Sequence, residues 1–127
     1  MNYSDPALVR EEKVAFERMR STIELIVTEH ALDRLNDLSR FPTPPRLRVD
    51  EEVRVLQVRR TDNRESVWMC QIEGGFLVGV LRETRRRQML IAMTAISRAM
   101  FRKTSYSRVA CDRVLVDKIT IQREEKR

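Results

Sequence analysis

The chain has 127 residues, of which 42% are hydrophobic and 35% charged, so we expect one domain over residues 1–127. These fractions exclude a disordered polyampholyte, collagen, a disulfide-rich miniprotein and a membrane-spanning protein. The net charge of +6, from 25 Lys and Arg against 19 Asp and Glu, favours a polyanionic partner.

The first predicted element is a helix over about residues 6 to 22. Ser4-Asp5-Pro6 is typical of a helix start, and apolar residues follow it at spacings of three and four. The next stretch is ambiguous, because Ile23 to Thr28 is rich in β-branched residues while Ala31 to Leu38 continues the helical pattern. Either one long helix or a helix, a strand and a second helix fits these residues.

A proline-rich connection over residues 41–45 separates this helical part, residues 1–40, from a sheet part over residues 46–121. A charged tail, residues 122–127, follows the sheet part. Behind the prolines the apolar residues alternate with polar ones or run continuously, as they do in strands. The expected strands are Leu47–Val58, Ser66–Ile72, Phe76–Leu81, Met89–Met93 and a last strand or hairpin over Val109–Ile121.

Three further expectations complete the fold. Glu73-Gly74-Gly75 predicts a turn and Arg82–Gln88 a polar loop, and Thr94 is expected to cap a short helix near residues 95–103. The predicted class is therefore α+β, with N-terminal helices packed on a mainly antiparallel sheet. The expected core residues are Trp68, Phe76, Val78, Val80 and Ile91.

Neither a metal nor a cofactor is expected. Cys70 and Cys111 lie far apart without a neighbouring cluster of histidines, which leaves too few ligands for zinc. The polar N-terminus lacks the apolar stretch of a signal peptide, and the longest apolar run, Met89–Ile96, is too short to cross a membrane. We therefore expect an intracellular protein, cytoplasmic or nuclear, without a membrane partner.

Of the 25 basic residues only four are Lys, and arginine presents the planar fork of donors that suits phosphate groups. Two expected loops concentrate arginines, which indicates binding of nucleic acid, RNA ahead of DNA, or of a host nucleoprotein complex. The alternative is that these loops are simply solvated. The N-terminal helix could also mediate a homodimer. The candidate nucleic-acid-binding residues are Arg59, Arg60, Arg64, Arg82, Arg85, Arg86, Arg87, Arg98, Arg102 and Lys103.

His30 is the only histidine, and Arg34 follows it at the i,i+4 spacing of one helix face. A neutral imidazole could accept a proton from a 2′-hydroxyl while the guanidinium stabilises charge on the phosphate, which is the chemistry of metal-free RNA cleavage. The alternative is an ordinary histidine on a helix surface.

The order His30-Ala31-x-x-Arg34-Leu35, then Gly75–Val80 and Leu90–Thr94, resembles the small RelE-like and BrnT-like toxin ribonucleases of phages and plasmids over residues 24–96. The resemblance implies a helix on a curved antiparallel sheet, with RNA across the sheet and His30, Arg34 and Thr94 near the scissile phosphate. The sequence thus leaves two hypotheses. The first is a small basic binding module of phage, viral or mobile-element type, and the second is a metal-independent ribonuclease that uses His30 and Arg34.

Overall fold

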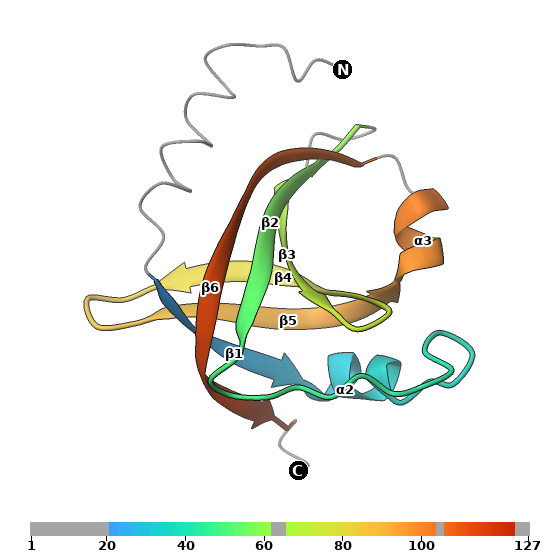
Figure 1. Cartoon of the computed structure of the whole chain (residues 1–127), viewed down its shortest axis with the longest axis horizontal. Helices are drawn as coiled ribbons and strands as arrows, with labels where there is room; N and C mark the ends of the chain where they lie inside the picture. The colour runs from blue at the N-terminus through green and yellow to red at the C-terminus, as the bar shows by residue number, and fades with distance from the viewer. Residues whose placement is uncertain (1–20, 62–65, 104–105, 124–127) are drawn as a thin grey trace.

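The computed structural model describes residues 21–61, 66–103 and 106–123, which form a closed barrel of six strands with two short helices at its surface (Figure 1). The strands are β1 (Thr22–Thr28), β2 (Glu52–Arg60), β3 (Ser66–Ile72), β4 (Gly75–Glu83), β5 (Gln88–Ser97) and β6 (Tyr106–Gln122). The helices are α2 (Glu29–Leu35) and α3 (Arg98–Lys103).

The strand order around the barrel is β1-β5-β4-β3-β2-β6. Strands β2 to β5 form an antiparallel meander, and β6 pairs antiparallel with β2. Strand β1 closes the barrel, because it pairs in parallel with β5 on one side and with β6 on the other. The sheet is therefore mixed, and its closure depends on the strand nearest the N-terminus of the described chain.

Two apolar layers lie on the two faces of the β2-β3-β4 wall. The barrel interior holds Leu25, Leu77, Leu90 and other buried side chains of every strand. The outer layer is covered by α3, whose Phe101 ring lies 4.6 Å from the Phe76 ring. Strand β4 is apolar on both faces because it contributes to both layers.

Helix α2 begins at Thr28, whose hydroxyl accepts a hydrogen bond from the amide of Ala31 at 3.2 Å and donates one to the carbonyl of Ala92 at 2.9 Å. Ala31 and Leu35 are buried against the barrel, and Phe41, 1% exposed, packs into the same core. The helix and the loop after it therefore close one end of the barrel.

The α+β class expected from the sequence is wrong, because the described chain is mostly strand. Residues Thr22–Thr28 form β1 and not part of a helix, which excludes one long helix through this region. The β-branched residues here gain parallel partners on both sides, and this pairing outweighs the helical pattern. The N-terminal helix over residues 6–22, and any homodimer through it, lie almost wholly outside the described residues.

Several boundaries also differ from the expectations. Strand β5 continues to Ser97, so Thr94 lies inside a strand and caps nothing. Ser97 takes the capping role, because its hydroxyl accepts a hydrogen bond from the amide of Met100 at 3.2 Å. The region expected as a strand or hairpin is one strand of 17 residues, β6. Of the charged tail, residues 124–127 lie outside the described chain.

The expected core is correct in part. Phe76 and Val78 are buried, whereas Trp68 and Ile91 are only partly buried and Val80 is 44% exposed. A register shift in the β4–β5 ladder falls between Val78 and Gly79, and Val80 follows it on the outer face. Val80 lies beyond the apolar layer under α3 and lines a second cavity instead, so no side chain of that layer covers it.

Candidate anion-binding fork in the barrel wall

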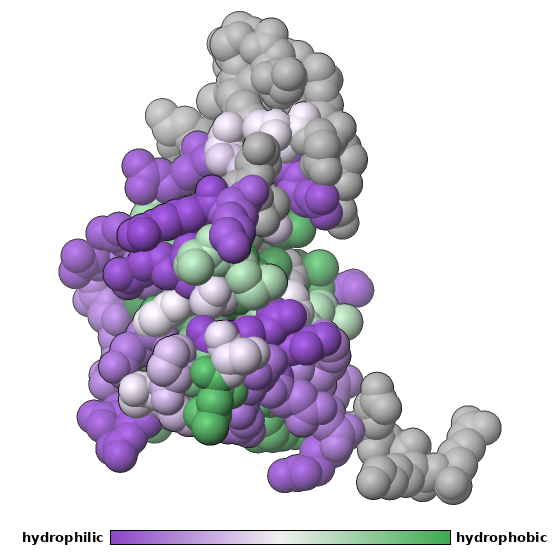
Figure 2. Space-filling view, turned by 90° about the vertical axis from the view of Figure 1, so that its right-hand side faces the viewer, coloured by the Kyte–Doolittle hydropathy of each residue, from purple (hydrophilic) through white to green (hydrophobic). Residues whose placement is uncertain are grey.

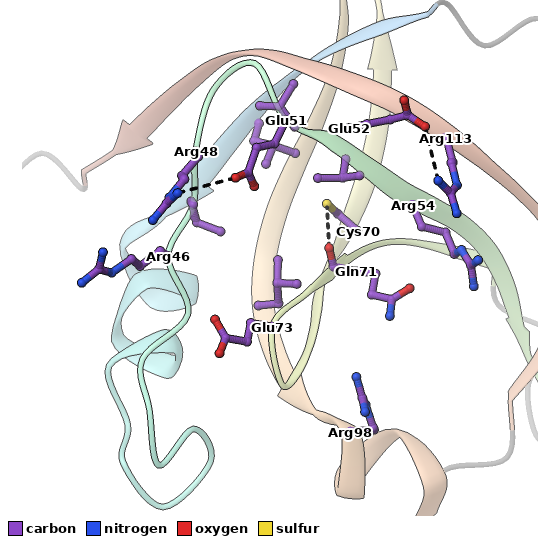
Figure 3. Close-up of a pocket in the computed structure, with 15 residues that line it drawn as sticks. Arg46, Arg48, Glu51, Glu52, Arg54, Cys70, Gln71, Glu73, Arg98 and Arg113 are labelled. Atoms are coloured by element: carbon purple, nitrogen blue, oxygen red, sulfur yellow. Dashed lines mark hydrogen bonds and ion pairs between the residues drawn. The ribbon is translucent and has the colours of Figure 1, made fainter.

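The main candidate site lies where two neighbouring strands separate. The β2–β3 ladder stops at the pair Val55 and Cys70. Strand β2 nevertheless extends to Glu52, still paired with β6, and β3 extends to Ile72, still paired with β4. The two strands diverge here and open a cavity of about 640 Å³ in the barrel wall, which we call the fork (Figure 3).

The fork has an apolar floor and a charged rim. The floor is formed by the partly buried apolar side chains of Leu47, Val53 and Ile72, which lie over the buried Leu25, Cys70 and Val116 of the barrel interior. Ten labelled residues around the cavity come from the loop before β2, from β2, β3 and β6, from the β3–β4 turn and from the start of α3 (Figure 3). The charged ones are Arg46, Arg48, Arg54, Arg98, Arg113, Glu51, Glu52 and Glu73.

Arg54 on β2 lies directly opposite Arg113 on β6. Two like charges at directly opposed positions destabilise a sheet. Glu52 offsets this only in part, since its carboxylate is 3.7 Å from Arg113 and both side chains are more than half exposed. Arg54 forms no ion pair with any carboxylate of the described chain. The pair therefore leaves positive charge available to an anion.

Arg98 reaches the fork from α3, whereas Arg54 and Arg113 lie on β2 and β6. Its amide donates a hydrogen bond to the carbonyl of Gly74 at 2.9 Å, which fixes the start of α3 against the β3–β4 turn. Gly74 has φ 81°, a left-handed conformation that glycine adopts without strain, as the predicted turn requires. The Arg98 side chain extends into the fork, toward the side where Gln71 lies (Figure 3).

The thiol of Cys70, beneath the floor, is buried. Burial raises the pKa of Cys70 to about 12, so the thiol is protonated at physiological pH. Within residues 21–61, 66–103 and 106–123, no group of three or more His, Cys, Asp or Glu side chains is placed to hold a metal ion. The floor of the fork therefore offers no thiolate nucleophile.

The candidate nucleic-acid-binding residues lie in several separate parts of the structure. Arg98 lines the fork, and Arg102 and Lys103 are exposed on the same helix, α3. Arg60 is partly buried at the end of β2. Arg59 is 6% exposed and its Nη2 donates to the Ser66 hydroxyl at 3.2 Å, so its guanidinium is not on the surface. Arg64 lies outside the described residues.

The expected polar loop at residues 82–88 is shorter than predicted. Arg82 belongs to β4, and a tight turn over residues 84–87 is closed by a 2.7 Å hydrogen bond from the amide of Thr84 to the carbonyl of Arg87. Arg82, Arg85 and Arg86 are exposed, whereas Arg87 donates to the buried carboxylate of Glu24. This turn and α3 lie on opposite sides of the molecule (Figure 1).

The three residues of the ribonuclease hypothesis are not gathered in one cavity. Arg34 Nε donates to His30 Nε2 at 3.4 Å on the exposed side of α2. His30 lines a second cavity together with Arg82 and Arg123, and Arg34 and Thr94 do not line it. Thr94 is paired with Val78 in the β4–β5 ladder.

Sequence reasoning missed four of the five fork arginines, which are Arg46, Arg48, Arg54 and Arg113. Arg54 stands between Val53 and Val55, so its exposure follows from the alternation that predicts the strand. The juxtaposition with Arg113 follows only from the register of β2 with β6. No sequence signal marks that long-range pairing.

No family model matches the chain, and no curated protein or solved structure matches it either. Neither helix of the described residues approaches the roughly 20 apolar residues with which a helix crosses a membrane, since α2 has seven residues and α3 six.

Proposed function

We propose that this protein is a nucleic-acid-binding module that contacts the phosphate backbone through the side of the barrel that carries α3. We name this side the α3 face. RNA is placed ahead of DNA because the sequence resemblance is to RNA-cleaving proteins. The α3 face is defined by the exposed basic residues Arg54, Arg98, Arg102, Lys103, Arg108 and Arg113.

The observation on which the proposal depends is the opposition of Arg54 and Arg113, because it is a local charge conflict that an anion would relieve. Arg108 extends the positive charge along β6, opposite Val58, on the same face of the β2–β6 pair. α3 adds Arg102, four residues after Arg98 on one helix face.

The chemistry of this face supports phosphate contacts. Only Arg113 among its members has a carboxylate within 4 Å in the described chain. Hydrophilic side chains predominate on this side of the molecule, with only small apolar areas between them (Figure 2). Guanidinium groups without an intramolecular carboxylate partner can neutralise phosphates, which releases the cations condensed on the nucleic acid and so favours binding.

The experiment compares two double variants that remove the same charge. Arg102→Gln with Arg108→Gln removes two cations from the α3 face, and Arg85→Gln with Arg86→Gln removes two from the β4–β5 turn. Binding to labelled RNA and DNA is measured by fluorescence anisotropy between about 50 and 200 mM salt. Each lost phosphate contact should lower the slope of log K against log salt by about 0.9 for duplex DNA or 0.7 for a single strand.

We expect the α3-face variant to flatten the salt dependence and the turn variant to leave it nearly unchanged. The reverse result would move the interface to the β4–β5 turn, which the clustering of arginines in the sequence favours. Wild-type protein that retains neither RNA nor DNA at 50 mM salt would refute the function itself.

A metal-independent ribonuclease is the second candidate function. The observation that favours it is the contact of Arg34 with His30 and the place of His30 beside Arg82 and Arg123 in one cavity. The Nε2 that accepts from Arg34 is the acceptor nitrogen of the imidazole, so His30 would act as a general base by exchanging this contact for the 2′-hydroxyl of a bound RNA. The cavity could hold a phosphate between the two arginines.

A further inference from the structure

We infer that the fork binds one unstacked nucleotide of a single-stranded nucleic acid, with its phosphate on the arginines and its base on the apolar floor. The inference rests on the proposed function and specifies its substrate as single-stranded. Duplexes are excluded from this site because their bases are stacked and paired, whereas proteins read single strands by taking up splayed bases.

The dimensions of the fork suit a group of this size. Its volume of about 640 Å³ falls within the range of roughly 300 to 1,000 Å³ that is typical of sites for small ligands. The opening results from the divergence of β2 and β3 beyond Val55 and Cys70 and belongs to the sheet itself. The cavity is therefore formed without a ligand.

The floor explains why a base is expected there as well as an anion. Leu47, Val53 and Ile72 line the cavity and are only partly buried, so they still expose apolar area to water. A hydrated inorganic anion gains nothing from such a surface, whereas the flat face of a base removes apolar area from water when it covers it. The site thus offers an apolar surface to the base of a nucleotide and a charged rim to its phosphate.

The arginines of the rim indicate where the phosphate would lie. A phosphate between Arg54 and Arg113 would convert their repulsion into two attractive contacts, and Arg98 could reach it from α3. Arginine suits this role because its planar fork can donate two parallel hydrogen bonds to phosphate oxygens.

The acidic residues of the rim limit the charge of the ligand. Glu51, Glu52 and Glu73 line the same cavity as the five arginines, so the net charge of the rim is small. A single phosphodiester fits this balance better than a nucleoside triphosphate, whose further charges would face the carboxylates. Gln71 and Glu73 supply donors and acceptors for the edge of the base.

The test uses wild-type protein and two charge-matched double variants. Arg54→Gln with Arg98→Gln alters the fork, and Arg85→Gln with Arg86→Gln alters the β4–β5 turn on the other side of the molecule. Circular dichroism and thermal unfolding are used to check that both variants fold. The ligands are a labelled single-stranded RNA of mixed sequence, its duplex, and an abasic strand that keeps every phosphate but lacks bases.

The fork variant should lose about tenfold or more in affinity for the single strand, since one charged hydrogen bond is worth at least about tenfold. Its affinity for the duplex should fall by a smaller factor, because there only the general phosphate contacts of Arg54 and Arg98 are lost. Wild-type protein should bind the abasic strand more weakly than the intact strand, and the fork variant should show a smaller difference between the two.

Two results would overturn the inference and leave the proposed function intact. One is an equal loss of affinity for single strand and duplex in the fork variant, which would indicate general electrostatic attraction. The other is equal wild-type affinity for abasic and intact strands, which would exclude a buried base. Absence of wild-type binding to every ligand would instead refute the proposed function, and the inference with it.

Discussion

Glu24 on β1 accepts a hydrogen bond from Arg87, which follows it by 63 positions and closes the β4–β5 turn. The carboxylate also accepts a hydrogen bond from the Thr120 hydroxyl of β6 at 2.8 Å. Burial alone would raise the pKa of Glu24, but the hydrogen bonds from Thr120 and Arg87 outweigh it and lower the pKa below its ordinary value of 4.5. One side chain thus joins β1, β6 and the arginine-rich turn.

The first prediction concerns acid stability. Because the pKa of Glu24 is lower in the folded state than in the unfolded state, its contribution is complete above about pH 4.5 and is lost as pH falls through the folded value. Glu24→Gln should cost about 1–3 kcal/mol at pH 7 and reduce the slope of stability against pH below 4.5. Urea unfolding from pH 3 to 7 measures both quantities.

Glu51→Gln is the matched control. Glu51 lies 3.9 Å from Arg48 and both side chains are more than half exposed, so the loss should stay below about 1 kcal/mol. If both variants lost stability equally and kept the same pH profile, Glu24 would have no special role.

The second prediction concerns the outer apolar layer. Phe76→Ala should cost about 3–5 kcal/mol, because the ring is 8% exposed and packs against Phe101 under α3. Leu38→Ala, at a residue 64% exposed, should change stability by less than about 0.5 kcal/mol. Denaturant unfolding of the two variants compares them, and a Phe76→Ala protein as stable as Leu38→Ala would contradict the assignment of this layer.

The third prediction concerns Gly79 at the register shift of the β4–β5 ladder. A Cβ built at Gly79 would lie 1.7 Å from the carbonyl oxygen of Ile91, so Gly79→Ala must displace backbone. We expect a loss of at least about 3 kcal/mol or failure to fold. Gly74→Ala should cost less, about 1–2 kcal/mol, because its Cβ meets only Phe41 at 3.6 Å and the cost arises from φ 81°. Equal melting temperatures for the two variants would show that the strands can separate at Gly79.

The fourth prediction separates the two candidate functions. If His30 is a general base, His30→Ala should keep RNA retention and stability while cleavage falls about 10²- to 10⁴-fold. If the protein only binds, retention is unchanged and no cleavage is present to lose. Gel analysis of RNA incubated with a chelator measures both. Under our first proposal wild-type protein leaves the RNA intact, and chelator-resistant cleavage would favour the second.

Local patterns predicted the middle strands well. Strand β3 has the predicted bounds, Ser66–Ile72, because alternation along one strand depends only on neighbouring residues. The turn at Gly74 and the double-sided burial at the start of β4 were also readable from composition. The sequence could not show that β1 is a strand, because its choice between helix and strand depends on partners in β5 and β6.

The candidate site was predicted only at Arg98. A run such as Arg85-Arg86-Arg87 is conspicuous in the sequence, yet Arg87 is engaged by Glu24. Arg54 and Arg113 are isolated arginines within strands, and only the register across the β2–β6 pair makes them neighbours. Charge density along the chain is therefore a poor guide to charge density on a barrel surface.

The parallel placement of β1 between β5 and β6 has a consequence for how the protein reaches its native state. Contacts between β1 and β6 join residues that are far apart in the sequence, as in Glu24 and Thr120, which are 96 positions apart. Such contacts must overcome the entropy of closing a long loop, so they slow folding, whereas the meander from β2 to β5 needs only local turns. A nascent chain on the ribosome can therefore form the meander early. Strand β1 cannot pair with β6 until β6 has been synthesised, and until then the unpaired edge of β1 is open to pairing with other chains.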